Sequence, residues 1–367
     1  MGTFDRRTFL KVAGGIGATS LTALAGCSGG GETDGTTTDG DGGSGDDVTN
    51  VGMVYATGGL GDGSFNDQAQ SGIMDATEDF NVEYNESQPE NTTDFSSHQE
   101  QFAQSTDPNY DLVASIGYLQ ADSLADTAAN YPDQQFMIVD ETVDADNVAS
   151  YVFREHEGSY LVGQLAGLLT TREFSAGGGE TKPDEKVVGF VGGVEGGLIG
   201  KFEAGFTAGV KSIDSEIEVK SGYAGSFTDP STGTEIADDM YSGGADIVYH
   251  AAGNTGTGVF ESAQSNGRFA IGVDRDQSIT KDGYADVILA SMVKRVDTAV
   301  YTAVESVVND AFEAGTNTLG LDDDGVATVY GDQIGSEIPQ EIKDQVSSSR
   351  EEIMAGDIEV PTDPENV

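Results

Sequence analysis

Short apolar runs alternate with amphipathic stretches between residues 51 and 312. Runs such as Val51–Ala56 and Leu112–Ile116 are apolar throughout, as in buried parallel strands. Elsewhere apolar residues recur at helical spacing, as at Ile199, Phe202 and Phe206. The predicted strands are 51–56, 112–116, 136–139, 151–153, 187–191, 220–223, 246–250, 269–273 and 287–292, and the predicted helices are 67–80, 119–130, 160–169, 199–213, 234–241, 258–265 and 296–312. This alternation predicts an α/β chain with two doubly wound parallel sheets in two lobes.

The sequence divides into four expected segments. Residues 1–27 are expected to be an export signal, and residues 28–47 form an acidic tether rich in Gly, Ser and Thr. The first lobe is expected over 48–153 and should also receive about 275–310. The second lobe is expected over 154–274 and should also receive about 311–360.

The N-terminus carries two targeting patterns in order. Arg6-Arg7, followed by Phe9-Leu10-Lys11 and a short Gly- and Ala-rich apolar run, resembles a twin-arginine export signal. Leu24-Ala25-Gly26-Cys27 resembles a lipobox, in which cleavage leaves Cys27 as the lipid-modified first residue. The apolar run is too short for a stable membrane span. A core helix with a buried cysteine is the alternative, but two independent motifs in the right order favour the targeting interpretation. We therefore expect lipid anchoring at Cys27 on the outer face of the cell membrane.

The charge is extremely acidic and unevenly distributed. Against 64 Asp and Glu stand 17 Lys and Arg, for a net charge of −47, and no Lys or Arg occurs between residues 12 and 153. This excludes nonspecific nucleic-acid binding and argues against docking on anionic lipid headgroups. The single cysteine excludes a disulfide framework and a Cys-based zinc site. Adaptation to multimolar salt, as in halophilic archaea, explains the balance better than calcium loading, which requires D-x-D-x-D-G loops that the sequence lacks.

Ligands of doubly wound folds bind beyond the carboxyl ends of the strands, so the loops after the predicted strands are the candidate site. The glycines of 58–63 lack the G-x-G-x-x-G spacing, and Asp62 among them would repel a pyrophosphate. The segment 196–202 is one residue too short for a P-loop. No G-x-S-x-G elbow of a serine hydrolase is present. The three histidines are isolated in sequence, which argues against a metal site: His98, His156 and His250.

An ordered set of motifs then resembles one family. The motifs are Asp62-Gly63-Ser64-Phe65-Asn66, Val188–Gly193, Lys201–Phe206, Ala245–Gly253, Ile271–Asp274 and Ser291–Asp297. Together they resemble the BMP family, the PnrA-like nucleoside-binding lipoproteins of ABC importers. The resemblance runs from about residue 51 to residue 308. The chain departs from this "basic" family in its acidity, and the acidic loop 175–185 looks like an insertion.

The resemblance implies a type I periplasmic-binding-protein fold, with two lobes joined by a hinge that close on a purine nucleoside. It implies stacking by Phe65 and recognition of the base edge by Asn66 and Asp140. Asp274 and Lys294 would bind the ribose. Further implied ligand-binding residues are Asp62, Ser64, Gly253 and Tyr249, with Tyr249 or a neighbour as the second stacking face. No catalytic residue, metal or cofactor is expected.

Each assignment has a structural alternative. Phe65 could be a hydrophobic staple, Ser64 or Asn66 an N-cap, and Asp140 the cap of a turn. Tyr249 lies in an apolar strand, where tyrosines are more often core residues. Phe202 and Phe206 are predicted to be core residues.

The expected function is an extracytoplasmic receptor that delivers a purine nucleoside to an ABC permease. Two alternatives stay open. The same fold could bind another small polar solute such as a flavin. The chain could also be a surface nucleoside hydrolase, which would need an acid cluster that activates water.

Overall fold

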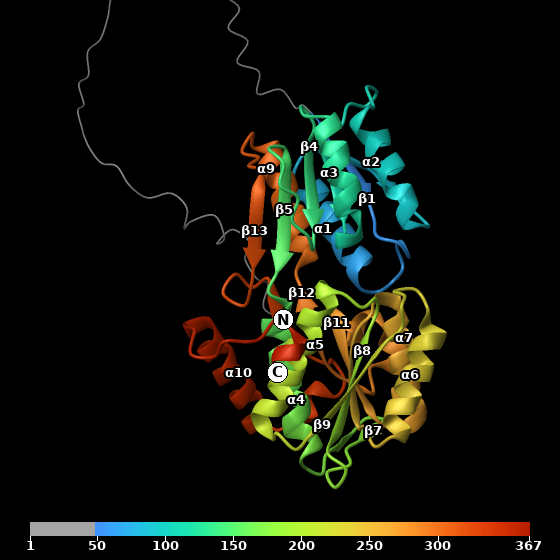
Figure 1. The fold of residues 1–367 in the computed structure, drawn as a ribbon, viewed down its shortest axis with the longest axis vertical. Coiled ribbons are helices and arrows are strands. Elements are labelled where there is room, and N and C mark those ends of the chain that lie inside the picture. The colour runs from blue at the N-terminus through green and yellow to red at the C-terminus, as the bar shows by residue number, and fades with distance from the viewer. Residues whose placement is uncertain (1–47) are drawn as a thin grey trace, which may run out of the picture. The chain divides into compact units, whose positions relative to one another are not determined.

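The computed structural model describes residues 48–367, so the expected signal, Cys27 and tether lie outside the described residues. The chain forms two main sheets in two lobes (Figure 1). The first sheet is wholly parallel, in the order β13 (Gly315–Leu319), β5 (Val148–Phe153), β4 (Gln135–Val139), β3 (Leu112–Ile116), β1 (Thr49–Val54) and β2 (Val82–Ser87).

The second sheet also has six strands, and its edge strand β14 runs antiparallel to β12. Its order is β14 (Val326–Tyr330), β12 (Ile288–Lys294), β11 (Phe269–Asp274), β10 (Ile247–Ala251), β8 (Val187–Gly192) and β9 (Glu218–Tyr223). This α/β architecture confirms the predicted two-lobed type I periplasmic-binding-protein fold.

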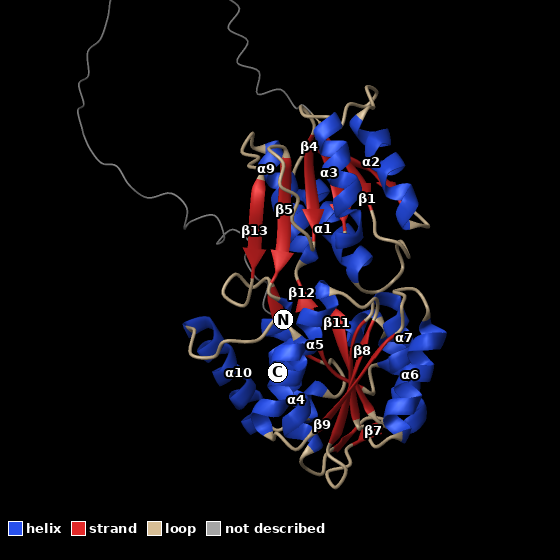
Figure 2. Cartoon of the chain, viewed as in Figure 1, coloured by secondary structure: helices blue, strands red, loops and turns tan. Residues whose placement is uncertain are grey.

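Helices cover both faces of each sheet (Figure 2). In the first lobe α1 packs against α9, and α2 packs against α3, with bounds α1 (Phe65–Asp79), α2 (Phe95–Ala103), α3 (Ala121–Asn130) and α9 (Val296–Val308). In the second lobe α4 pairs with α5 and α6 with α7, with bounds α4 (Glu155–Thr170), α5 (Gly197–Ile213), α6 (Pro230–Ser242), α7 (Gly256–Asn266), α8 (Gln277–Thr280) and α10 (Gln340–Ala355). Among the described helices none is long and apolar enough to cross a membrane.

The central strands of both main sheets were predicted, and so was the edge strand β9, but the other three edge strands, β2, β13 and β14, were not. The strands β3 and β10 are buried at every position and read as continuous apolar runs. The edge strand β2 has the sequence VEYNES and is mostly solvent-accessible. Its polar residues do not form an apolar run, so the strand was not predicted. The expected insertion 175–185 contains a small hairpin of β6 (Ser175–Ala176) and β7 (Gly179–Glu180).

The crossings between lobes correct the expected boundaries. The range 275–310 was expected in the first lobe, but β12 pairs with β11 in the second sheet, and only α9 from this range packs on the first. Within the range 311–360, expected in the second lobe, β13 instead joins β5 in the first sheet. Apolar runs identify a strand, but they do not state which sheet it joins, because both sheets present equally apolar neighbours.

Three crossings therefore connect the lobes. They follow β5 at Arg154, β12 at Arg295 and β13 at residues 320–325. Residues at the two ends of the third crossing bond the other two. The Arg154 amide donates to the carbonyl of Leu319, the last residue of β13, at 2.9 Å, and the Arg295 amide donates to the Gly325 carbonyl at 2.9 Å.

The last helix of the first lobe ends earlier than predicted. The stripe from Val296 was expected to reach Phe312, but α9 ends at Val308. Asp310 has a positive φ of 52°, which a right-handed helix cannot accommodate. Phe312, beyond that break, still packs against the core, so its apolar character does not require a helix there.

Candidate functional site

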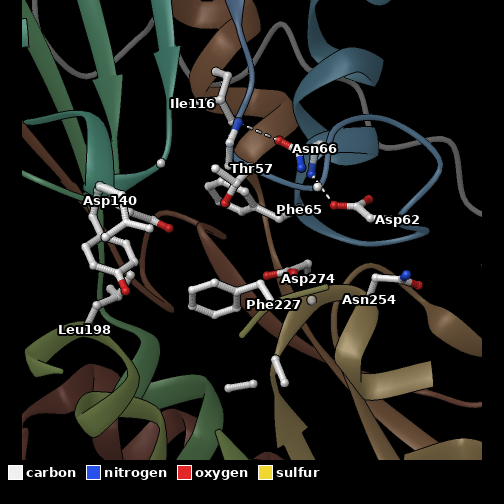
Figure 3. A pocket seen from close by; sticks show the side chains of 18 of the residues that line it. Thr57, Asp62, Phe65, Asn66, Ile116, Asp140, Leu198, Phe227, Asn254 and Asp274 are labelled. Carbon is white, nitrogen blue, oxygen red and sulfur yellow. Dashed lines mark hydrogen bonds between the residues drawn. The ribbon is translucent and has the colours of Figure 1, made fainter. Parts of the chain in front are cut away.

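A cavity lies at the carboxyl ends of strands from both sheets, where the fold places ligands (Figure 3). In the first lobe its lining comes from the ends of β1, β3 and β4 with the loops after them, and from the starts of α1 and α2. In the second lobe it comes from α5, the loops after β9 and β10, and the last residues of β11 and β12. Of the sequence-predicted site residues, the lining contains Asp62, Phe65, Asn66, Asp140, Gly253, Asp274 and Lys294.

Asp62 organises the loop before α1. Its carboxylate accepts backbone N–H groups of Ser64 at 2.8 Å, Asn66 at 2.9 Å and Asp67 at 3.2 Å. Burial raises the pKa of Asp62, and these N–H groups oppose the rise. Ser64 occupies the N-cap position of α1, as the structural alternative proposed, but its side chain makes no capping bond, because the Asp62 carboxylate accepts the first amides of the helix instead. Asn66 lies inside the helix and is not its N-cap.

Asn66 is fixed at the start of α1. Its Oδ1 accepts the backbone N–H of Ala56 at 3.0 Å, which ties α1 to the end of β1. That bond occupies the amide oxygen, so the amide nitrogen is the group with which Asn66 can donate to a ligand.

Asp140 and Lys294 form a buried ion pair across the lobes. Lys294 Nζ lies 2.9 Å from Oδ1 and 2.7 Å from Oδ2 of Asp140, and both side chains are almost completely buried. Burial lowers the pKa of Lys294, but the carboxylates of Asp140, Glu155 and Asp274 outweigh it and hold that pKa above its ordinary value. Lys294 therefore carries its charge at the floor of the cavity, beside the Phe65 ring at 5.0 Å.

Asp274 is the second buried acid of the site. Its Oδ2 accepts the Ser64 hydroxyl at 2.5 Å, and burial raises its pKa to about 6 although Lys294 and this hydroxyl oppose the rise. Asp140 directly follows β4 and Asp274 is the last residue of β11, and both have a left-handed conformation, with φ of 74° and 65°. Such backbone is costly for residues other than glycine and concentrates at functional sites.

The first-lobe loop is bonded directly to the second lobe. The Gly63 carbonyl accepts the Thr280 hydroxyl at 2.8 Å and the Gln277 side-chain amide at 3.4 Å. With the Ser64–Asp274 bond, these contacts hold the two walls of the cavity together.

Aromatic rings face the cavity from both lobes. Phe65 comes from the start of α1, and Phe227 comes from the loop after β9 (Figure 3). Phe227 meets Tyr118 of the first lobe edge-on, with ring centroids 6.5 Å apart. A flat ligand between Phe65 and Phe227 would have an apolar surface on each side.

Two expected ligand residues do not line the cavity. Tyr249 is wholly buried, packs on Phe190 and Phe206, and bonds the Ser159 hydroxyl at 3.2 Å. It is a core residue, because its side chain leaves the strand on the face that α4 and α5 cover. Ser64 is also wholly buried and acts on Asp274.

Sequence reasoning missed Phe227 and assigned Phe202 to the core alone. Phe227 was detectable as a lone aromatic in the polar loop Gly225-Ser226-Phe227-Thr228, directly after a strand. Phe202 packs in the core, as predicted, and one side of it also lines the cavity. Gly253 has a φ of 55°, a conformation that favours glycine there.

No group of three or more potential metal ligands is gathered within residues 48–367. The carboxylate oxygens of Asp62 are occupied by backbone amides, and those of Asp140 by Lys294. The cavity therefore presents mainly aromatic and charged side chains to a ligand.

Comparison with known proteins gives a consistent picture. The model of the family described as "ABC transporter substrate-binding protein PnrA-like" matches residues 49–363. The chain is 32% identical to the ABC transporter nucleoside-binding protein BmpA of Lactococcus lactis, over 84% of this chain and 88% of that protein. It is also 32% identical to an uncharacterized lipoprotein of Pyrococcus furiosus, over 83% of this chain and 73% of that protein.

The fold also matches a solved relative. An ABC transporter solute-binding protein from Aeropyrum pernix K1 superimposes with a TM-score of 0.75 at 27% identity, covering 86% of this chain and 95% of that one. The family match, the relatives and the fold all indicate a substrate-binding protein, and the cavity between the lobes is where such a fold binds its ligand. The chain belongs to the Bmp, or PnrA-like, family of ABC transporter substrate-binding proteins.

Proposed function

We propose that the protein binds a purine nucleoside in this cavity and delivers it to an ABC permease. The observation that carries the proposal is the pair of aromatic side chains, Phe65 and Phe227, that line the cavity from opposite lobes above a buried ion pair. A purine has two apolar faces and a polar edge, and this arrangement supplies both kinds of contact. The similarity to a nucleoside-binding relative supports it.

The polar groups suit a neutral ligand with hydroxyl and amine donors. Within the described lining, three carboxylates (Asp62, Asp140 and Asp274) accompany one ammonium group, on Lys294. A phosphate would face an excess of negative charge in a site of low dielectric. The proposed ligand is therefore a nucleoside and not a nucleotide, with Asp140 and Asn66 at the base edge and Asp274 and Lys294 at the ribose.

Two experiments test this function: identification of the small molecule that is purified with the protein, and measurement of the affinity for nucleosides. Mass spectrometry of small molecules released from the purified protein should find a purine nucleoside. Calorimetric titration in concentrated potassium chloride should then show binding of adenosine, guanosine or inosine and much weaker binding of the 5′-monophosphate. A released flavin would favour the alternative ligand, and recovery of free base plus ribose after incubation would favour the hydrolase.

Stacking gives a prediction for single substitutions. Phe65→Ala and Phe227→Ala should each lower nucleoside affinity about 5- to 150-fold, because truncating a stacked aromatic costs about 1–3 kcal/mol per base. Calorimetric titration measures the change. Phe80→Ala is the matched control, since Phe80 lies at the far end of α1 and packs on Tyr301 with ring centroids 5.6 Å apart. If Phe65 were a staple for α1, its truncation would lower thermal stability, as at Phe80, and leave affinity unchanged.

We also propose that Cys27 anchors the protein outside the cytoplasm through a lipid. The twin-arginine pattern, the lipobox and the polar tether support this, as does the lipoprotein relative. Cys27→Ala should release the protein to the medium or leave it unprocessed, which membrane fractionation and intact mass would detect. Normal processing and unchanged membrane association would refute anchoring at this residue.

A further inference from the structure

Glu155 is a carboxylate buried where the first crossing enters the second lobe. It is the first residue of α4, immediately after Arg154, and its exposed fraction is 0%. Neither of its carboxylate oxygens has a hydrogen-bond partner among the described residues. A buried ionised carboxylate without hydrogen bonds is costly, so its environment calls for an explanation.

The groups that face Glu155 come from four elements. Lys294 Nζ of β12 lies 3.8 Å from one oxygen, and Lys201 Nζ of α5 lies 3.8 Å from the other. Asp140, after β4, and the Tyr249 hydroxyl of β10 complete its electrostatic surroundings. Both ammonium groups are beyond hydrogen-bond range, and Lys294 is already bonded to both oxygens of Asp140.

This geometry makes two carboxylates compete for one lysine. Asp140 holds Lys294 directly, while Glu155 attracts it from behind the cavity. Burial raises the pKa of Glu155 to about 7, with Lys294 and Lys201 opposing the rise and Asp140 adding to it. A carboxylate whose pKa is raised by burial gains a proton more readily than a free one, and a proton on Glu155 removes its pull on Lys294.

We propose that Glu155 is a positioning residue that acts on the ligand through Lys294, and that it takes up a proton when ligand fills the cavity. This rests on the proposed function, since it requires a ligand beside Lys294. A ligand oxygen that accepts the remaining N–H of Lys294 draws that ammonium group away from Glu155. The counter-ion that opposes the raised pKa is then weaker, so the neutral form of Glu155 is favoured. Neutral Glu155 also leaves the remaining N–H of Lys294 to the ligand.

Proton uptake on binding requires affinity to fall as pH rises. If binding raises the Glu155 pKa by about one unit from about 7, affinity should fall roughly fivefold between pH 6 and pH 8. Titration of adenosine, guanosine and inosine in two buffers of different ionisation enthalpy measures the protons taken up. Glu155→Gln should abolish the uptake and leave less than about a twofold change over this range. If the fall in affinity with pH and the proton uptake both persist in Glu155→Gln, they belong to another group such as Asp274, and the proposal is overturned.

A second variant tests the same link without touching the cavity. Lys201 is absent from the described cavity lining, and removing its charge by Lys201→Met should raise the pH at which affinity falls, because Glu155 loses one counter-ion. Lys211→Met is the matched control, since Lys211 on the same helix bonds the Ile217 carbonyl at 2.7 Å. An unchanged midpoint in Lys201→Met, or an equal shift in Lys211→Met, would contradict the proposed link.

A measurement without ligand separates this inference from the proposed function. An acid with a raised pKa in the folded state costs stability as pH rises from its unfolded value of about 4.5 to about 7. The melting temperature of Glu155→Gln relative to the parent should therefore increase across that window. If this difference appears but no nucleoside binds, the proposed function fails while the titration of Glu155 stands. A flat difference shows that Glu155 does not titrate there and overturns the inference.

Discussion

Lowering potassium chloride from multimolar levels to about 0.1 M should unfold the protein. The net charge is −47, so surface carboxylates repel one another. This repulsion extends over about 3 Å at 1 M salt and over about 10 Å at 0.1 M, so it is stronger at low salt. Circular dichroism across a salt series measures the loss. A signal that stays flat down to about 0.1 M would refute salt adaptation.

The two lobes should differ in this transition. The first lobe is built from residues 48–153 with α9 and β13, and these segments contain no Lys or Arg. The ion pairs of the second lobe include Lys186–Asp214 at 2.7 Å and Arg268–Glu180 at 3.4 Å. Amide hydrogen exchange should therefore show β1 and β3 opening at higher salt than β8 and β10.

The fold was largely predictable from local pattern. Central strands read as apolar runs and helices as 3.6-residue stripes, so β3, β10 and α5 were found from sequence. Three of the four edge strands and the lobe crossings were not found, because they depend on which neighbour a strand meets far along the chain. β12 and β13 show this, since each joined a different sheet from the one expected.

The site was predictable in its loops but not in its pairings. Asp62, Asn66 and Asp274 lie at strand ends or helix starts, where the fold collects ligand groups, and the structure places them in the cavity lining. Tyr249 was misplaced because alternate strand residues face opposite sides, and the sequence does not state which side is the core. The Asp140–Lys294 pair joins residues 154 positions apart, which no local pattern reveals.

That pair gives the second large prediction, for Lys294→Met. Removing the lysine leaves Asp140 and Glu155 buried without their shared counter-ion, and breaking a buried ion pair on one side costs about 3–5 kcal/mol. Denaturant unfolding in concentrated salt measures the loss. Lys220→Met removes the same charge from a half-buried lysine of β9 that, among the described residues, bonds only a backbone carbonyl, that of Gly243, and it is the control, expected to change stability little.

Lys294→Met should also lower the affinity for two ligands, the free base and the nucleoside. A role at the ribose alone would spare the base, but Lys294 holds both oxygens of Asp140, so its loss also releases the group proposed to bind the base edge. The nucleoside should lose more, because it loses the ribose contact too. Calorimetric titration of both ligands on the variant decides this, and unchanged affinity for the base would show that Asp140 keeps its position without the lysine. Adding Asp140→Asn to Lys294→Met should recover part of the lost stability, since one uncompensated charge is then removed with its partner.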